Sequence, residues 1–160
     1  HTASTYERTP SSYKSLHEED LRNTLLAALN ATYKGDATGE TFRNAGKTDI
    51  CIERENRAAF VAECKMWTGQ KEVSSAVFQL DSYLTWRDCK TALIYFVRRK
   101  DFLKVLENAE NALKTIDGMK RVSSVDKNEF ECQLLSRTNP GQLVRIQVML
   151  LIYIRNKVIP

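Results

Sequence analysis

Histidine is scarce in this chain of 160 residues, which contains only His1, at its first position, and His17. Histidine is the side chain that most often moves protons in catalysis, because its ordinary pKa lies near neutrality. Activation of a cysteine nucleophile also depends on a neighbouring histidine. The sequence therefore favours neither histidine-based acid–base catalysis nor a Cys–His nucleophile.

Cysteine is uncommon as well, and no two cysteines are spaced as C-x-x-C. The four cysteines are Cys51, Cys64, Cys89 and Cys132. Without that spacing, and with so few histidines, we expect no zinc site. Their positions in predicted strands, or at the edge of one, favour reduced and partly buried thiols in a cytoplasmic protein.

Several other signatures are missing. The sequence shows no signal peptide, no P-loop and no dinucleotide-binding glycine pattern. Its most apolar run, residues 148–154, is far shorter than the roughly 20 residues that span a membrane. The net charge of +4 suits a nucleic-acid binder, although many other proteins carry as much. We therefore expect no membrane partner.

The composition is that of one folded domain. With 42% hydrophobic residues, 160 residues can bury a sufficient core but leave no room for a second one. Residues 1–13 are rich in Ser, Thr and Tyr without periodicity, so they are predicted to be a flexible lead-in to a single domain over 14–160. Because the first residue is not methionine, we expect this domain to be excised from, or part of, a longer protein.

The spacing of apolar residues predicts an α/β fold with a mixed sheet flanked by helices, in the order α-β-β-β-α-β and then α-β-β. Residues 91–97 form a continuous apolar run, which predicts a central strand buried on both faces. Residues 116–127 contain Asp117-Gly118 and paired serines, which predict a loop. The predicted helices span 16–33, 70–85 and 102–114, and the predicted strands span 38–43, the segment around Asp49, 58–65, 91–97, 129–136 and 143–155.

The most informative feature is a pair of carboxylates in two neighbouring strands. Residues 46–65 read as two strands around a tight turn, with Asp49 on the first strand and Glu63 on the second. Successive side chains on a strand point to opposite faces, so Glu63 and Lys65 share one face while Cys64 takes the other. If Asp49 pairs near Glu63, two carboxylates and an ammonium group converge on one patch.

These residue types suit a magnesium or manganese ion. Magnesium prefers oxygen ligands, usually one or two carboxylates together with water and substrate phosphate. Asp49, Glu63 and the backbone carbonyl of Cys64 could supply the protein ligands. Such an ion lowers the pKa of a bound water, and Lys65 could orient that water or neutralise charge in the transition state. The pattern therefore predicts metal-assisted hydrolysis of a phosphodiester.

Two polar side chains on the predicted helix over 70–85 complete the pattern. Gln79 and Tyr83 lie four residues apart, together with Glu72 along one border of the apolar stripe. From that border they could reach the site or a substrate phosphate. The alternative is a structural role, in which the Tyr83 hydroxyl is bonded at the edge of the core.

The ordered set Asp49, Glu63-Cys64-Lys65 and Gln79 to Tyr83 resembles the PD-(D/E)xK nuclease superfamily, with the QxxxY motif of its RecB-like branch. The resemblance covers residues 14–97, and Thr48 stands where the proline of the motif would be. It implies a restriction-endonuclease-like core, a catalytic set of Asp49, Glu63, Lys65, Gln79 and Tyr83, and metal ligation by Asp49, Glu63 and Cys64. A glutamate on the first helix often approaches the metal in this superfamily, which points to Glu18. That residue could equally belong to a solvated first helical turn.

Together these features predict a Mg²⁺- or Mn²⁺-dependent deoxyribonuclease. Arg98, Arg99 and Lys100 follow the predicted central strand and could contact the phosphates of DNA, although such clusters are more often solvated chain ends. A homodimer would supply the two sites that cutting both strands needs. Two alternatives stay open: a catalytically inactive nucleic-acid-binding or scaffolding module of the same fold, and an RNase.

Overall fold

The computed structural model describes residues 22, 23, 25, 27, 37–43, 46–54, 57–84 and 90–152. Between residues 37 and 59 it describes the backbone, and side chains only for Ile50 and Cys51. The predictions for residues 1–13, for Glu18 and for Cys89 lie outside these residues. Within the described part of the chain, no helix is both long and apolar enough to cross a membrane.

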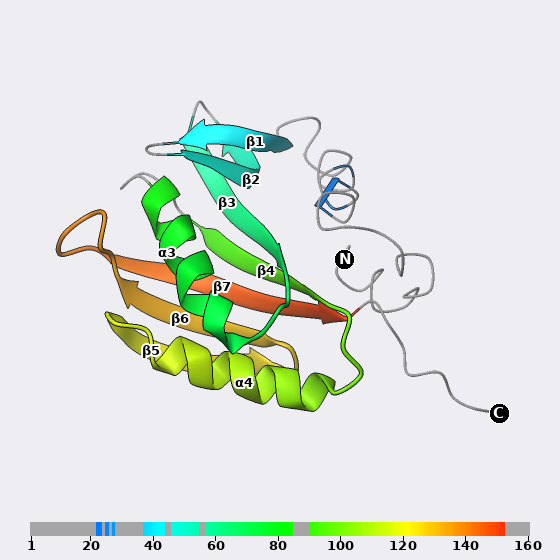
Figure 1. Ribbon diagram of the computed structural model, residues 1–160. Coiled ribbons are helices and arrows are strands. Elements are labelled where there is room, and N and C mark those ends of the chain that lie inside the picture. The colour runs from blue at the N-terminus through cyan, green and yellow to red at the C-terminus, as the bar shows by residue number, and fades with distance from the viewer. Residues whose placement is uncertain are drawn as a thin grey trace.

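Seven strands form one mixed sheet in the order β1-β2-β3-β4-β7-β6-β5 (Figure 1). The pairs β3–β4 and β4–β7 are parallel, and the outer pairs on both sides are antiparallel. The strands are β1 (Ala37–Arg43), β2 (Gly46–Arg54), β3 (Arg57–Met66), β4 (Thr91–Val97), β5 (Met119–Asp126), β6 (Glu129–Leu135) and β7 (Leu143–Ile152). The predicted α/β class with a mixed sheet is confirmed.

The strand β4 lies at the centre of the sheet, and all seven of its residues are buried. Its apolar composition explains this, because a strand between two parallel neighbours is covered on both faces and has no polar side to present to water. The prediction of a central strand at 91–97 is therefore confirmed. Every other strand is arranged outward from this one.

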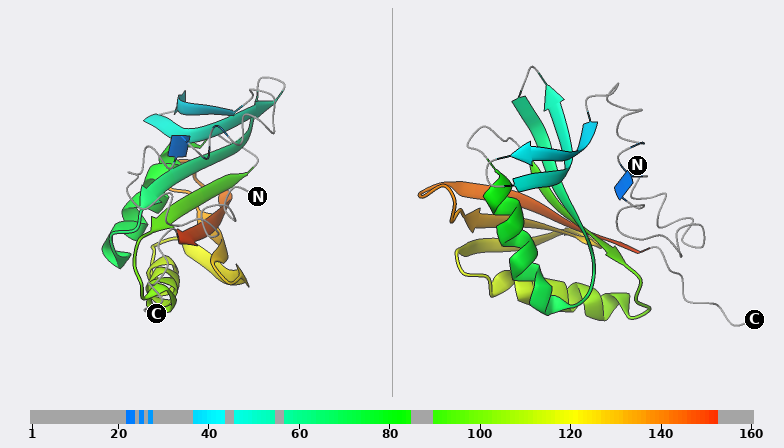
Figure 2. Two further views of the ribbon diagram at one scale, coloured as in Figure 1. Left: turned by 90° about the vertical axis from the view of Figure 1, so that its right-hand side faces the viewer. Right: turned by 45° about the horizontal axis from the view of Figure 1, so that its top comes forward.

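Two helices, α3 (Val73–Tyr83) and α4 (Phe102–Lys114), cover the same face of the sheet (Figure 2). The larger of two apolar clusters contains Val77 of α3, Leu113 of α4 and Leu93 of β4. The opposite face carries a smaller cluster, which includes Ile50, Ala62 and Phe96.

Part of the helix predicted over 16–33 borders this smaller cluster. All four described residues in that range are helical, and Leu25 is buried against the cluster. The apolar position on the predicted stripe is therefore the one that meets the sheet, as expected for an amphipathic helix.

Two predicted elements differ from the structure. The segment 116–127, predicted to be a loop, contains the strand β5, which pairs with β6 in an antiparallel register. Its side chains are largely polar and exposed because it is an edge strand, so the apolar alternation that marks an inner strand is absent. The helix predicted from residue 70 begins instead with a 3₁₀ turn, η2 (Gln70–Glu72), before α3 starts at Val73.

The turn that leads into β5 requires glycine at residue 118. Gly118 has φ = +85°, and a Cβ atom there would lie 3.1 Å from the carbonyl oxygen of Leu135. Gly141, in the turn before β7, has φ = +81° but nothing within 4 Å of that position. The two glycines thus share a backbone conformation and differ in the space around them.

We expect Gly118→Ala to destabilise the protein more than Gly141→Ala does. Gly141→Ala should lower the free energy of unfolding by about 1–2 kcal/mol through backbone strain alone. Gly118→Ala adds a backbone clash and should lower it by about 2–4 kcal/mol. Urea unfolding followed by circular dichroism measures both, and equal losses would contradict the close approach at Gly118.

Candidate functional site

A buried ion pair on β3 forms the centre of the candidate site. Glu63 is only 2% exposed, and Lys65 Nζ lies 3.3 Å from its Oε1 atom. A buried carboxylate is strongly disfavoured unless a positive group or hydrogen bonds compensate its charge. The Lys65 side chain, 30% exposed, supplies that charge while keeping access to solvent.

The alternation of β3 places this pair on the face covered by α3. The side chain of Cys64, between them, packs with Ile50 and Ala62 in the cluster on the opposite face. The prediction that Glu63 and Lys65 share a face from which Cys64 is turned away is therefore confirmed. The role predicted for the Cys64 carbonyl as a metal ligand stays a prediction.

The backbone of β2 brings Asp49 next to Glu63 in the sheet. Ile50 is paired with Ala62, and Cys51 with Val61, in an antiparallel register. One further step of this register sets Asp49 opposite Glu63. The structure describes the backbone of Asp49 as part of β2, whereas its side chain lies outside the described residues.

Gln79 and Tyr83 form a hydrogen-bonded pair on α3. The Gln79 amide Nε2 donates to the Tyr83 hydroxyl oxygen over 2.6 Å, and both side chains are half-buried. One helical turn separates the two residues, which is the spacing that lets side chains on a helix meet. Tyr83 therefore contacts Gln79 and helps to fix the direction in which the amide points.

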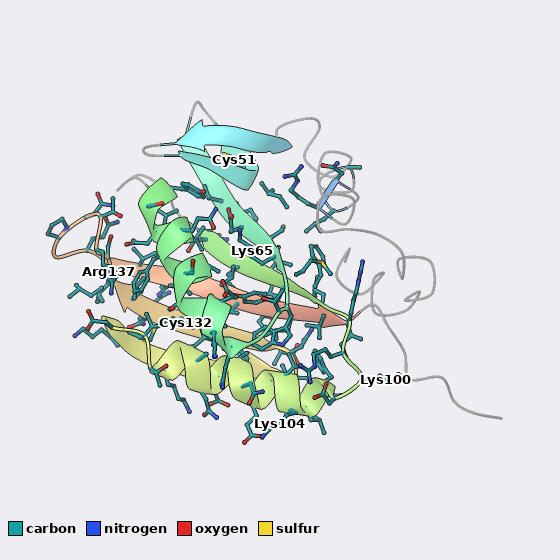
Figure 3. All side chains as sticks on the ribbon, in the orientation of Figure 1. Cys51, Lys65, Lys100, Lys104, Cys132 and Arg137 are labelled. Atoms are coloured by element: carbon teal, nitrogen blue, oxygen red, sulfur yellow. The ribbon has the colours of Figure 1, made fainter. Side chains whose placement is uncertain are left out.

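A pocket of about 270 Å³ lies between this helix and the ends of β3 and β4. Its polar lining consists of Lys65, Thr68, Glu72, Ser75, Gln79 and Tyr95. The structure thus brings Lys65 and Gln79, which are distant in the sequence, to one cavity. Figure 3 shows Lys65 on β3 beside α3. The pocket offers one ammonium group and several hydrogen-bond donors, which is the chemistry that binds an anion.

The sequence pattern did not point to Tyr95 as a pocket residue, nor to Thr68 and Ser75. Tyr95 lies within the apolar run of β4 and is 2% exposed, so the apolar pattern alone marks it as part of the core. The available signal was its hydroxyl, the only polar side-chain group among residues 92–97. Burial, and then the negative charge of Glu72, raise the pKa of Tyr95 far above its ordinary value, so its hydroxyl stays protonated.

Part of the basic cluster that follows β4 (Arg98, Arg99 and Lys100) is engaged in ion pairs. Arg99 donates two hydrogen bonds of 2.9 Å to Asp101, which hold the pKa of Asp101 below and that of Arg99 above their ordinary values. Lys104 lies 3.4 Å from Glu107, while Lys100 is exposed and has no ion pair within the described part of the chain. Figure 3 places Lys100 and Lys104 near the start of α4.

The three cysteines whose side chains are described are Cys51, Cys64 and Cys132, and all three are buried and form no disulfide with one another. Burial, followed by the charge of Glu131, raises the pKa of Cys132 to about 12. A thiol with such a pKa is a poor nucleophile at neutral pH. The predicted thiols were expected to be partly buried, and these three are fully buried.

The donor types present suit a magnesium ion. Glu63 offers carboxylate oxygens, and the register sets a second acidic residue, Asp49, opposite it. Among the side chains that the structure describes, no three His, Cys, Asp or Glu residues gather closely enough to hold a metal ion. Asp49 and Glu18, on which the predicted ligand set depends, are not among those side chains.

Comparison with known proteins adds no assignment. No protein-family model, curated protein or solved structure matches this chain.

Asp81, which lies between Gln79 and Tyr83, anchors α3 to the turn between β6 and β7. It is 1% exposed and accepts hydrogen bonds from Ser136 Oγ at 2.7 Å and from the Arg137 backbone N–H at 2.9 Å. The guanidinium of Arg137 stacks 3.5 Å above the ring of Phe78 on the same helix. These contacts fix the position of α3, and with it the position of Gln79.

We expect Asp81→Ala to lower the free energy of unfolding by about 2–4 kcal/mol, because it leaves buried donors without an acceptor. Ser82→Ala is the matched control, since among the described residues the Ser82 hydroxyl donates only to the Gln79 carbonyl one turn earlier, and it should lower that free energy by less than about 1 kcal/mol. Urea unfolding measures both losses. If Asp81→Ala is no more destabilising than Ser82→Ala, the anchoring role is wrong.

Proposed function

We propose that this protein is a Mg²⁺- or Mn²⁺-dependent nuclease of the PD-(D/E)xK type that hydrolyses phosphodiester bonds in DNA. The observation that carries the proposal is the buried Glu63–Lys65 pair on β3, beside a pocket that Lys65 and Gln79 both line. The order of described elements, three antiparallel strands followed by a helix and a parallel strand, also agrees with a restriction-endonuclease-like core.

In this proposal Asp49 and Glu63 hold the metal, with the Cys64 carbonyl and Glu18 as further ligands. A bound magnesium ion supplies Lewis-acid chemistry, lowering the pKa of a bound water and stabilising charge on phosphate oxygens. The burial of Glu63 supports its role, because a carboxylate shielded from bulk water binds a cation more strongly than an exposed one. Lys65 already balances the charge of Glu63 before any cation binds.

The position of Lys65 supports a role at the phosphate. Its ammonium lies at the wall of the pocket and remains partly exposed, so it can reach both Glu63 and a bound anion. There it would orient the attacking water or neutralise charge that develops on the phosphate oxygens. Gln79, held by Tyr83, would contact the substrate from the opposite wall.

We expect Glu63→Gln and Lys65→Met each to reduce Mg²⁺-dependent cleavage of DNA by at least about 100-fold, since each removes a charge that acts at the reacting phosphate. Plasmid nicking with Mg²⁺, with Mn²⁺ and with EDTA is the measurement. The wild-type protein should cleave with either ion and not with EDTA.

Glu110→Gln is the control for these two substitutions. Glu110 is a half-buried glutamate on α4, 2.8 Å from Lys114, and its loss changes the net charge as Glu63→Gln does. Its cleavage rate should equal that of the wild type, and circular dichroism should show that all three variants are folded. A Glu63→Gln protein that cleaves at the wild-type rate overturns the proposal.

The same assay separates the two alternatives. Binding of DNA without cleavage under any metal would make the protein a non-catalytic nucleic-acid-binding module. Cleavage of RNA but not of DNA in a substrate panel would make it an RNase, because contacts to the 2′-hydroxyl can distinguish RNA from DNA.

The basic cluster gives a separate prediction about DNA binding. Lys100 follows β4, at the same end of the sheet as Lys65 and the pocket. If it contacts a phosphate, Lys100→Ala should lower affinity for a DNA duplex and reduce the slope of log K against log salt by about 1.

Lys114→Ala is the control, because it removes the same charge from the far end of α4, where Lys114 is paired with Glu110. It should leave the slope unchanged. Fluorescence anisotropy at several salt concentrations gives both slopes, and identical slopes for the two variants would show that Lys100 is a solvated residue.

A further inference from the structure

Tyr95 lies on β4, next to the Lys65 residue of the ion pair on β3. In the parallel register between β3 and β4, Lys65 pairs with Tyr95. Paired residues of neighbouring strands carry their side chains on the same face, and both residues line the same pocket. Tyr95 therefore lies on the strand next to Lys65 and lines the same cavity.

The hydroxyl of Tyr95 is buried and makes no hydrogen bond to the described residues. The ring packs edge-on against Trp67, with centroids 5.3 Å apart and planes at 83°. A phenylalanine ring could make that contact equally well. Leaving a buried hydroxyl unpaired is unfavourable, so its presence at this position calls for another explanation.

We infer that Tyr95 is a substrate-binding residue, whose hydroxyl donates a hydrogen bond to a phosphate oxygen held in the pocket beside Lys65. This inference rests on the proposed function for its substrate, a nucleic-acid phosphate. The hydroxyl remains protonated because burial raises the pKa of Tyr95, so it is a donor to an anion under all working conditions. A hydrogen bond to a charged acceptor is about twice as strong as one between neutral groups.

The rest of the pocket agrees with an anion in this position. Lys65 supplies the positive charge, and the Gln79 amide and the Ser75 hydroxyl line the same cavity. The acidic residue of the lining, Glu72, lies on η2 and is exposed, so water weakens its repulsion of an anion, while its charge still contributes to the raised pKa of Tyr95. The partly exposed Lys65 and the buried Tyr95 therefore line one cavity.

Tyr95→Phe is the direct test, because it removes one oxygen and keeps the ring. We expect affinity for inorganic phosphate to fall about tenfold, measured by NMR titration of the β3 and β4 amides with Mg²⁺ present. In the nicking assay, the variant should cleave at least about tenfold more slowly at low DNA concentration. Its urea midpoint should equal or exceed that of the wild type, since an unpaired buried hydroxyl is removed.

Thr91→Val is the matched control, since it removes a buried hydroxyl from the same face of the same strand. The Thr91 hydroxyl, unlike that of Tyr95, donates to a protein acceptor, the carbonyl oxygen of Arg145. Thr91→Val should therefore lower the urea midpoint and leave phosphate affinity unchanged. The two variants are expected to show opposite patterns of stability and binding.

The outcomes separate this inference from the proposed function. If Tyr95→Phe loses stability as Thr91→Val does and binds phosphate like the wild type, the hydroxyl is structural and the inference is overturned. A wild-type protein that binds no phosphate overturns it as well. If the wild type cleaves no nucleic acid while phosphate binding still depends on Tyr95, the nuclease proposal fails and the role of Tyr95 as an anion donor stands.

Discussion

The parallel pairing of β4 with both β3 and β7 is the constraint on which the remaining structure depends. Consecutive parallel strands need a crossover, and crossovers in one sheet are almost always right-handed. The chain moves in the same direction from β3 to β4 and from β4 to β7, so both crossovers place their helices on one face. This is why α3 and α4 lie side by side over the larger apolar cluster, and why α3 lies over Glu63 and Lys65.

Two acidic residues are buried on the side of the sheet that α3 covers. Glu63 and Asp81 are both almost fully buried acids, one on β3 and the other on α3, but their surroundings differ. Asp81 is surrounded by hydrogen-bond donors of the β6–β7 turn, which is a structural arrangement. Glu63 faces a partly exposed lysine beside a pocket, which leaves room for an ion or a substrate. The same residue type therefore serves stability at one position and, in our proposal, chemistry at the other.

The elements that the sequence predicted correctly are those with strong local signals. The strand β4 is continuously apolar, the hairpin of β2 and β3 has a polar turn between apolar strands, and α4 has apolar residues at helical spacing. The strand β5 was predicted to be a loop because its residues are polar and contain a glycine turn. Its strand conformation comes from hydrogen bonds to β6, which are made between backbone groups and leave no mark on the pattern of side chains.

In the candidate site, too, some features follow from local sequence signals and others from the tertiary structure alone. The sequence by itself determined that Glu63 and Lys65 share a face and that Gln79 and Tyr83 are one helical turn apart, because both follow from the local geometry of a strand and a helix. Only the tertiary structure decided that Lys65, Gln79 and Tyr95 border one pocket. Their strands and helix are brought together by the pairing of β4 with β3, and no local sequence pattern encodes the register of that pairing. A tyrosine within an apolar run reads as part of the core. Its position beside Lys65 becomes visible only when β4 is paired with β3.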